Sequence, residues 1–234
     1  MPRRKNIIIG EYYHIYNREN SKQNLFFEEK DWARFFFLIL YLQSPIPFYN
    51  IGRSISYFVR HRRSNMLSNM LNMFNISKNI EDDVIKNRYV ELINFCLMPN
   101  HFHITAREIK KGGISKYLQR IQIAYTKYLN TKREKSGHLF QGSFRAVHIK
   151  DNVQLLHLSA YIHRNPREIN QWKNQEQEYP WSSYRDYIKE NRWNGLLKRE
   201  IILGQFSGKK EYQNFVKTSS AKLLPDEMHL DSEC

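Results

Sequence analysis

The chain has 234 residues, which suits a single domain with additions, and 41% of them are hydrophobic, enough to build a core. Its 37 Lys and Arg against 23 Asp and Glu give a formal net charge of +14, which favours a nucleic-acid partner over charge kept only for solubility. The two cysteines, Cys96 and Cys234, exclude a disulfide framework. No apolar stretch approaches the ~18 residues of a membrane span, which excludes a membrane helix. We therefore expect a cytoplasmic, nucleoid-associated protein.

The first part of the chain predicts one strand, one helix and a basic insertion. Residues 12–17 (YYHIYN) are aromatic and β-branched, which favours a strand. Residues 28–42 place apolar side chains three and four apart, as in an amphipathic helix packed on a sheet, and Pro45 and Pro47 end it. Residues 53–86 are basic and rich in Asn and Met, and we interpret them as an insertion that is either a helical arm or a disordered loop.

The next part predicts two strands, a long helix, a further strand and a further helix. Residues 89–98 and 101–106 have strand patterns on either side of a turn at Pro99 and Asn100. An apolar stripe along residues 114–132 predicts the long helix, and residues 144–149 predict the strand that follows a glycine-containing loop. Asp151 is a typical N-cap for a helix that runs to about Asn165, where Pro166 would end it.

The order of these elements predicts the fold class. The first six read βαββαβ, the order of a ferredoxin-like domain, so we expect an α+β protein with an antiparallel sheet and helices on one face. We assign residues 1–188 to this domain, with the insertion at about 53–86, and residues 189–234 to a small helical C-terminal extension. Its last residues, from about 221, have the composition of a disordered tail.

A histidine pair is the sharpest local signal. In the segment MPNHFHI, His101 and His103 alternate with Phe102, so a strand would project both imidazoles to one face. Two neighbouring imidazoles form half of a divalent-metal site, but His-x-His is common, and two surface or hydrogen-bonded histidines are the competing interpretation.

A second candidate pair lies at the end of the last predicted core helix. Tyr161 and Asn165 are four residues apart and so share a helix face, where an amide oxygen could join a metal shell and a phenol could attack phosphorus. By themselves these residues equally suit a core tyrosine and a helix terminus before Pro166.

Four segments in order, LMPNHFHI, GHLFQGSFRA, YIHRNP and WSSY, resemble the single-tyrosine HUH transposases, which include insertion-sequence transposases and REP-associated tyrosine transposases. The resemblance runs from about Gly10 to Tyr187, and the 53–86 insertion and the tail depart from it. It implies a ferredoxin-like fold, in agreement with the element order. It also implies that His101, His103 and Asn165 bind Mg²⁺ or Mn²⁺ and that Tyr161 is the nucleophile.

The activity implied by the resemblance is metal-dependent cleavage and transfer of single-stranded DNA beside a hairpin. Tyr161 would attack phosphorus, which leaves a 5′-phosphotyrosine and a free 3′-hydroxyl. Members of this family include monomers and dimers, so the resemblance leaves open whether this protein forms a homodimer. Two alternatives remain: a non-catalytic regulator of the same fold that binds DNA or RNA hairpins, and a metal-dependent hydrolase that uses water while Tyr161 is structural.

Several basic and aromatic residues near the long helix are candidates for contact with DNA, and each could equally belong to a solvated surface. Phe140 lies between Gly137 and Gly142 and could stack on a base or fill the core. Tyr125 is our second choice for the nucleophile, although we interpret it, with Tyr117 and Tyr128, as packing. The DNA-binding candidates are Arg120, Lys127, Lys132, Arg133, His138, Phe140 and Arg145.

Overall fold

The structure is a computed structural model that describes residues 7–63 and 73–219. The strands in these ranges are β1 (Tyr12–Arg18), β2 (Val90–Met98), β3 (His101–Glu108) and β4 (Arg145–His148). The helices are α1 (Glu29–Tyr41), α2 (Ile51–Arg63), α3 (Lys78–Asn87), α4 (Gly113–Arg133), α5 (Asn152–Arg164), α6 (Tyr184–Ile188), α7 (Glu200–Leu203) and α8 (Lys209–Thr218). Each strand and helix predicted between residues 12 and 165 is therefore confirmed, with small shifts at its ends.

The four strands form one antiparallel sheet in the order β2-β3-β1-β4. This is the strand order of a ferredoxin-like domain, which confirms the predicted α+β class. Strand β3 lies in the interior of the sheet, where β1 and β2 pair with it on either side. Side chains of β3 therefore alternate between two buried faces, and residues 101, 103 and 105 share one of them.

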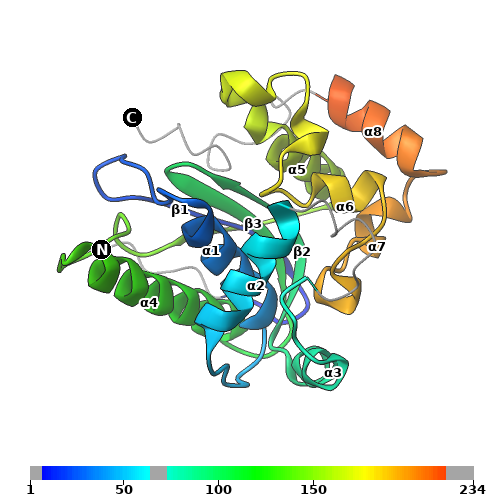
Figure 1. Cartoon of the computed structure of the whole chain (residues 1–234). Helices are drawn as coiled ribbons and strands as arrows, with labels where there is room; N and C mark the ends of the chain where they lie inside the picture. The colour runs from blue at the N-terminus through cyan, green and yellow to red at the C-terminus, as the bar shows by residue number, and fades with distance from the viewer. Residues whose placement is uncertain (1–6, 64–72, 220–234) are drawn as a thin grey trace.

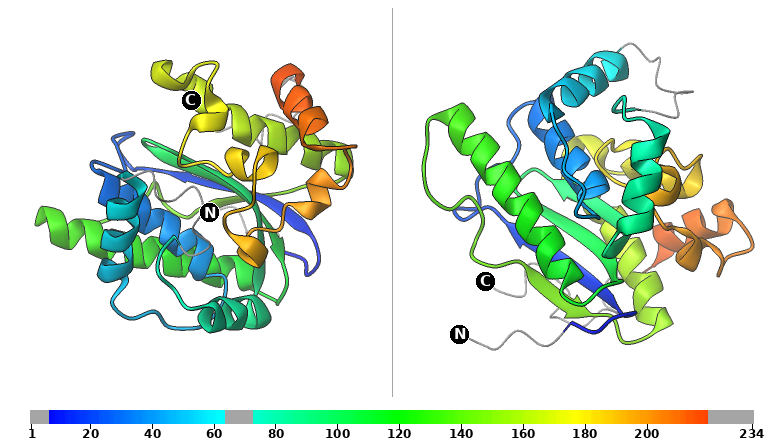
Figure 2. Two further views of the ribbon diagram at one scale, coloured as in Figure 1. Left: turned by 45° about the vertical axis from the view of Figure 1, so that its right-hand side comes forward. Right: turned by 90° about the horizontal axis from the view of Figure 1, so that it is seen from below.

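Helices cover both faces of the sheet, as Figure 1 and the turned views of Figure 2 show. The two helices of the βαββαβ core, α1 and α4, lie on one face, as predicted. Helix α5 lies on the opposite face together with α6 and α8. The expectation of helices on one face was therefore incomplete. The second face of the sheet carries His101 and His103 of β3, and α5 buries these side chains.

Residues 53–86 are an integral part of the fold where the structure describes them. Helix α2 packs on α1 through Ile55, Phe58 and Val59, and the ring of Phe58 stacks on that of Phe74 with centroids 4.5 Å apart. The described parts of this segment are mainly helical, as the helical interpretation expects, and three apolar side chains bind α2 to the core. The interpretation of residues 53–86 as an insertion stays a prediction. Residues 64–72 lie outside the described part.

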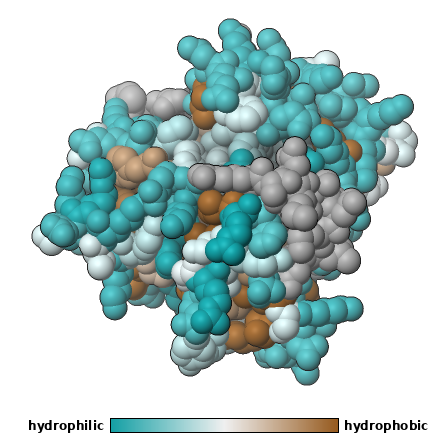
Figure 3. Space-filling view, viewed as in Figure 1, coloured by the Kyte–Doolittle hydropathy of each residue, from teal (hydrophilic) through white to brown (hydrophobic). Residues whose placement is uncertain are grey.

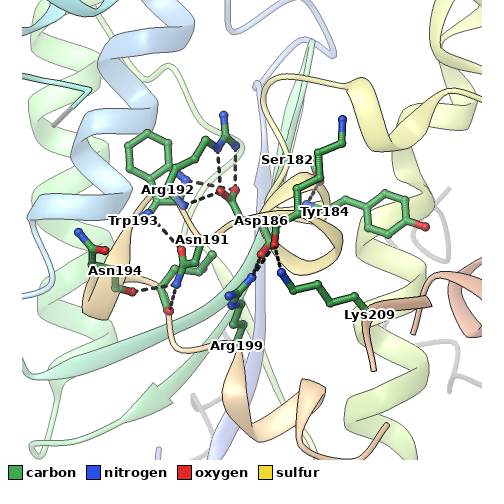
Figure 4. Close-up of polar contacts among 11 residues, drawn as sticks. Ser182, Tyr184, Asp186, Asn191, Arg192, Trp193, Asn194, Arg199 and Lys209 are labelled. Atoms are coloured by element: carbon green, nitrogen blue, oxygen red, sulfur yellow. Dashed lines mark hydrogen bonds and ion pairs between the residues drawn. The ribbon is translucent and has the colours of Figure 1, made fainter. Parts of the chain in front are cut away.

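The C-terminal extension is held by a buried carboxylate. Asp186, in the middle of α6, is fully buried and accepts hydrogen bonds from Arg192 Nε (2.7 Å), Arg192 Nη2 (2.8 Å) and Trp193 Nε1 (3.2 Å) (Figure 4). The Trp193 ring in turn packs against Phe36 of α1, with centroids 4.8 Å apart. The expected disordered end, from about residue 221, lies outside the described residues.

The surface seen in Figure 3 is mainly hydrophilic, and hydrophobic residues appear there in small separate patches. Among the described residues, no helix combines the length and the apolar character needed to cross a membrane. Buried aromatic side chains instead fill the space between α1, α2 and the sheet, where Phe35, Phe36 and Phe37 are fully buried.

Candidate catalytic site

Strand β3 presents His101 and His103 to the face that α5 covers. Phe102, between them, points to the other face and packs on Phe35 of α1, with ring centroids 5.2 Å apart. The two imidazole rings lie 5.0 Å apart and nearly perpendicular, and they are 7% and 0% exposed. The predicted projection of both histidines to one face is therefore confirmed, and they are not surface side chains.

Both imidazoles make a hydrogen bond through Nδ1. Nδ1 of His101 lies 2.7 Å from Oδ1 of Asn100, an acceptor, so in the neutral ring the proton is on Nδ1. Nδ1 of His103 lies 2.9 Å from Nε2 of His14 on β1. A ring whose proton is held at Nδ1 offers the Nε2 lone pair to a metal ion.

Helix α5 brings the second pair to the same place. The Asp151 carboxylate caps the helix by accepting from the Gln154 backbone N–H at 2.8 Å. Three turns later the ring of Tyr161, only partly buried, meets His103 edge-on with centroids 5.6 Å apart. Sequence separates these residues by 58 positions (161 − 103), and the packing of α5 on the sheet brings them together.

Asn165 suits the role of an oxygen ligand. It is 3% exposed, and its Nδ2 donates to the Tyr161 carbonyl oxygen at 2.9 Å. Its Oδ1 is buried and has no hydrogen-bond partner among the described residues. A buried carbonyl oxygen without a donor is costly, and a cation would satisfy it. No group of three His, Cys, Asp or Glu side chains that could hold a metal occurs in the described ranges, so the fit depends on this amide.

The helix that carries Tyr161 is anchored from behind by His163. Its Nδ1 lies 2.7 Å from Tyr212 Oη of α8 and its Nε2 lies 2.8 Å from Ser183 Oγ. Complete burial lowers the pKa of His163 to about 3, so the ring is neutral at physiological pH. Ser183 belongs to the WSSY segment, whose backbone bonds to β2 through Ser183 N and Phe95 O (3.0 Å). His163 thus has a structural role.

The competing tyrosines on α4 are unsuitable nucleophiles. Tyr125 is fully buried and its hydroxyl donates to the Leu25 carbonyl at 2.8 Å, and burial raises its pKa well above the ordinary value. Tyr117 is equally buried and donates to the Ile39 carbonyl. Burial and the Asp31 carboxylate raise the pKa of Tyr128 to about 12. Their interpretation as packing residues agrees with these contacts.

Two of the predicted DNA-contacting cations have structural roles. The guanidinium of Arg120 donates to the carbonyls of Ser44 and Ile46 and to the Tyr89 hydroxyl. Lys132 forms ion pairs with the buried Asp31 (2.5 Å) and with Glu28 (2.8 Å). Because both cations already bind partners within the fold, we no longer assign them to phosphate contacts.

The structure also contradicts the prediction that Phe140 contacts DNA. It is 6% exposed, and its ring packs against Phe35 and Phe102 with centroids 6.4 and 6.1 Å away. The loop between Gly137 and Gly142 is tied along the end of β1 by backbone hydrogen bonds such as Gln141 N to Arg18 O (2.9 Å). The aromatic ring therefore fills the core and offers no face to a base.

The remaining candidates line two surface pockets on either side of this loop. A pocket of about 390 Å³ is bordered by Lys127 and His138, both exposed. A pocket of about 110 Å³ is bordered by the exposed Arg145, by Arg18 and by Lys22. Arg133 is exposed and stacks over the Phe27 ring at 3.5 Å. Phosphate contacts by these cations stay a prediction.

Sequence reasoning missed His14. It is fully buried on β1, and its ring stacks on His103 with centroids 5.1 Å apart and an interplanar angle of 16°. The alternation in YYHIYN predicts that His14 and Tyr16 share a face, but nothing in the sequence indicates that this face is the one under α5.

Comparison with protein-family models matches residues 56–165 to the family described as "Transposase IS200 like". The matched span contains His101, His103, Tyr161 and Asn165. The match spans 110 of the 234 residues, so this part of the chain is similar to the IS200-like transposase family. It extends across most of the segment that we had predicted to be an insertion.

Two further comparisons were made with the whole chain. A search of curated proteins gives no match. Among solved structures, the chain is similar to one described as a REP-associated tyrosine transposase bound to a REP hairpin, with 16% identity and a TM-score of 0.49. That similarity covers 86% of this chain and 90% of the other.

Proposed function

We propose that this protein is a transposase that cuts and rejoins single-stranded DNA beside a hairpin through a covalent link to Tyr161, with a divalent cation bound by His101, His103 and Asn165. The observation that carries the proposal is the position of these side chains: the Tyr161 ring lies 5.6 Å from that of His103, and one turn further along the chain the buried Oδ1 of Asn165, the C-cap of α5, has no donor among the described residues. The choice of a hairpin-associated strand rests on the resemblance of the four sequence segments.

Each side chain has a defined task in this reaction. Tyr161 attacks the scissile phosphorus: its Oη forms a bond to phosphorus, its proton passes to solvent, and the bond from phosphorus to O3′ breaks. The electron pair stays on O3′, which takes up a proton and becomes a free 3′-hydroxyl. Mg²⁺ or Mn²⁺, when bound, would neutralise charge on the scissile phosphate. Attack by another 3′-hydroxyl reverses the step and joins two strands.

The donor set suits Mn²⁺ and Mg²⁺ to different degrees. Two imidazoles and one amide oxygen are softer than the all-oxygen shell that Mg²⁺ prefers. We therefore expect tighter binding of Mn²⁺, with both ions able to support cleavage.

A covalent-adduct assay tests the proposal. The full chain is incubated with a hairpin panel carrying single-stranded flanks, labelled at either end, with Mn²⁺ or with EDTA. We expect the 3′-labelled fragment to remain attached to protein on a denaturing gel, the 5′-labelled fragment to be released, and EDTA to prevent both.

Two single-atom variants locate the nucleophile. Tyr161→Phe should abolish the adduct and the cleavage, whereas Tyr125→Phe, which removes a buried hydroxyl elsewhere, should retain both. An adduct formed by Tyr161→Phe would contradict the assignment. Cleavage without an adduct would indicate attack by water, and hairpin binding without cleavage at any metal concentration would indicate a regulator.

A further inference from the structure

A row of buried polar side chains crosses the sheet beneath the catalytic site. Asn94, Thr105 and His14 occupy adjacent positions on β2, β3 and β1, since Thr105 pairs with both of the others. Paired residues project to the same face, and Thr105 shares the face of His103 because the two are two residues apart on β3. All three side chains are 0% exposed and lie under α5.

Two members of this row carry polar atoms that the fold does not satisfy. Oδ1 and Nδ2 of Asn94 and Oγ1 of Thr105 are buried without a hydrogen-bond partner within the described ranges. Apolar side chains at these positions would avoid the free-energy cost of burying unpaired polar atoms, so packing alone does not explain the row. Such groups are commonly bridged by ordered water, which makes about three hydrogen bonds to buried polar atoms.

The link between the row and the catalytic site is His14. Its Nε2 lies 2.9 Å from Nδ1 of His103, and one of these two nitrogens must carry the proton that they share. If His103 binds a cation through Nε2, its own proton is on Nδ1 and is donated to His14. His14 then carries its proton on Nδ1, and that N–H requires an acceptor.

The row supplies that acceptor. Thr105 lies directly opposite His14 in the register of β1 and β3, and Asn94 is the next side chain along the row. Neither oxygen is hydrogen-bonded to another described group, so each can accept the His14 proton through one buried water.

We propose that His14 is a positioning residue which, held by Thr105 and Asn94, fixes the His103 tautomer whose Nε2 can bind the cation. The inference rests on the proposed cation site. In this arrangement a chain of hydrogen bonds runs from the interior of the sheet to the metal ligand, and His14 itself touches neither the metal nor DNA.

Nitrogen NMR of the metal-free protein tests the tautomer independently of activity. With ¹⁵N-labelled histidine, His103 should show its proton on Nδ1 in the wild type. In His14→Ala the proton should shift toward Nε2 or exchange between the two nitrogens. An unchanged His103 tautomer in His14→Ala would overturn the proposal.

Binding of Mn²⁺ alone, followed by electron paramagnetic resonance of the full chain, gives the second readout. His14→Ala should weaken Mn²⁺ affinity roughly 10- to 100-fold, the range usual for loss of a side chain that orients a metal ligand. His14→Gln, whose side-chain amide can accept from Nδ1 of His103, should recover most of the affinity. Tyr117→Phe, which deletes a buried hydroxyl on the other face, should bind Mn²⁺ as the wild type does.

Further variants keep the outcomes distinct. If His14→Ala does not fold, His14→Gln and Thr105→Val test the proposal in its place. Thr105→Val should weaken Mn²⁺ binding several-fold if Thr105 holds His14. Wild-type affinity in Thr105→Val would overturn the part played by the row. Failure of the wild type itself to bind Mn²⁺ would instead contradict the proposed function, while wild-type affinity in His14→Ala would contradict this inference alone.

Discussion

The side chain of Asn165 is hydrogen-bonded to the backbone of Tyr161, one turn earlier in α5, at 2.9 Å. A carbonyl oxygen accepts only from a donor, so the amide must present Nδ2 to Tyr161 and keep Oδ1 for another partner. The bond therefore orients the proposed cation ligand from the same residue that supplies the nucleophile.

This orientation predicts that an aspartate is a poor substitute at position 165. Asn165→Asp would set a carboxylate oxygen against the Tyr161 carbonyl, and Asn165→Ala would remove the ligand altogether. We expect both to weaken Mn²⁺ binding, with Asn165→Ala weaker by roughly 10- to 100-fold, as is usual for losses around metal sites. Titration with Mn²⁺ checks this, and full affinity in Asn165→Ala would remove the residue from the cation site.

The free energy of unfolding should depend on pH through the ionisation of the Asp31 carboxyl. Burial would raise the pKa of this carboxyl, but hydrogen bonds from Lys132, Tyr128 and the Phe27 and Glu28 backbone outweigh burial and lower it. A lowered pKa in the folded state gives stabilisation that is complete above the unfolded pKa, about 3.9, and is lost as the pH falls through the folded value.

Asp31→Asn should therefore be less stable than the wild type by roughly 1–3 kcal/mol at neutral pH, the scale of charged hydrogen bonds. The difference should shrink as the pH falls below about 4. Urea unfolding between pH 3 and 7 measures it, with the exposed Asp83→Asn as control. A difference that stays constant with pH would show that the Asp31 charge does not stabilise the fold.

Asp186 should be a major contributor to the stability of the C-terminal extension. Removing its side chain leaves Arg192 and the Trp193 indole N–H without their acceptor, so Asp186→Ala should cost about 3 kcal/mol. Glu178→Ala, which breaks the exposed pair with Lys189, should cost less than about 1 kcal/mol. Denaturant unfolding compares the two, and equal effects would contradict the structural importance of Asp186.

The salt dependence of DNA binding separates contacts with phosphate from contacts within the fold. Lys127→Ala and Arg145→Ala, at the borders of the two pockets, should each reduce the slope of log affinity against log salt by about 1. Lys132→Ala should leave the slope unchanged, because that ammonium already pairs with Asp31 and Glu28. Filter binding of a hairpin from 50 to 300 mM salt, roughly the range where such slopes are measured, distinguishes these outcomes.

The parts of the site that sequence could predict depend on local periodicity. Alternation along a strand places His101 and His103 on one face, and helical spacing places Tyr161 and Asn165 on another. That the two faces meet is a property of long-range packing, so the sequence alone left Tyr161 equally suited to the core, and only the resemblance favoured the active-site interpretation.

The errors have the same physical origin. Arg120 and Lys132 look like surface cations in sequence, and only the folded chain shows the carbonyls that Arg120 binds and the carboxylate that pairs with Lys132. Phe140 sits between two glycines as a loop residue would, yet it fills a gap between Phe35 and Phe102.

Attachment of α8 to α5 has a consequence for deletion experiments. Tyr212 reaches His163, and Ser219 bonds to His157, one turn before Tyr161, at 2.8 Å. Shortening the protein at residue 188 would strip these supports from the helix that holds the phenol and the amide. Loss of cleavage in such a truncated protein would then reflect a loosened helix, and would be poor ground for placing DNA contacts in the removed segment.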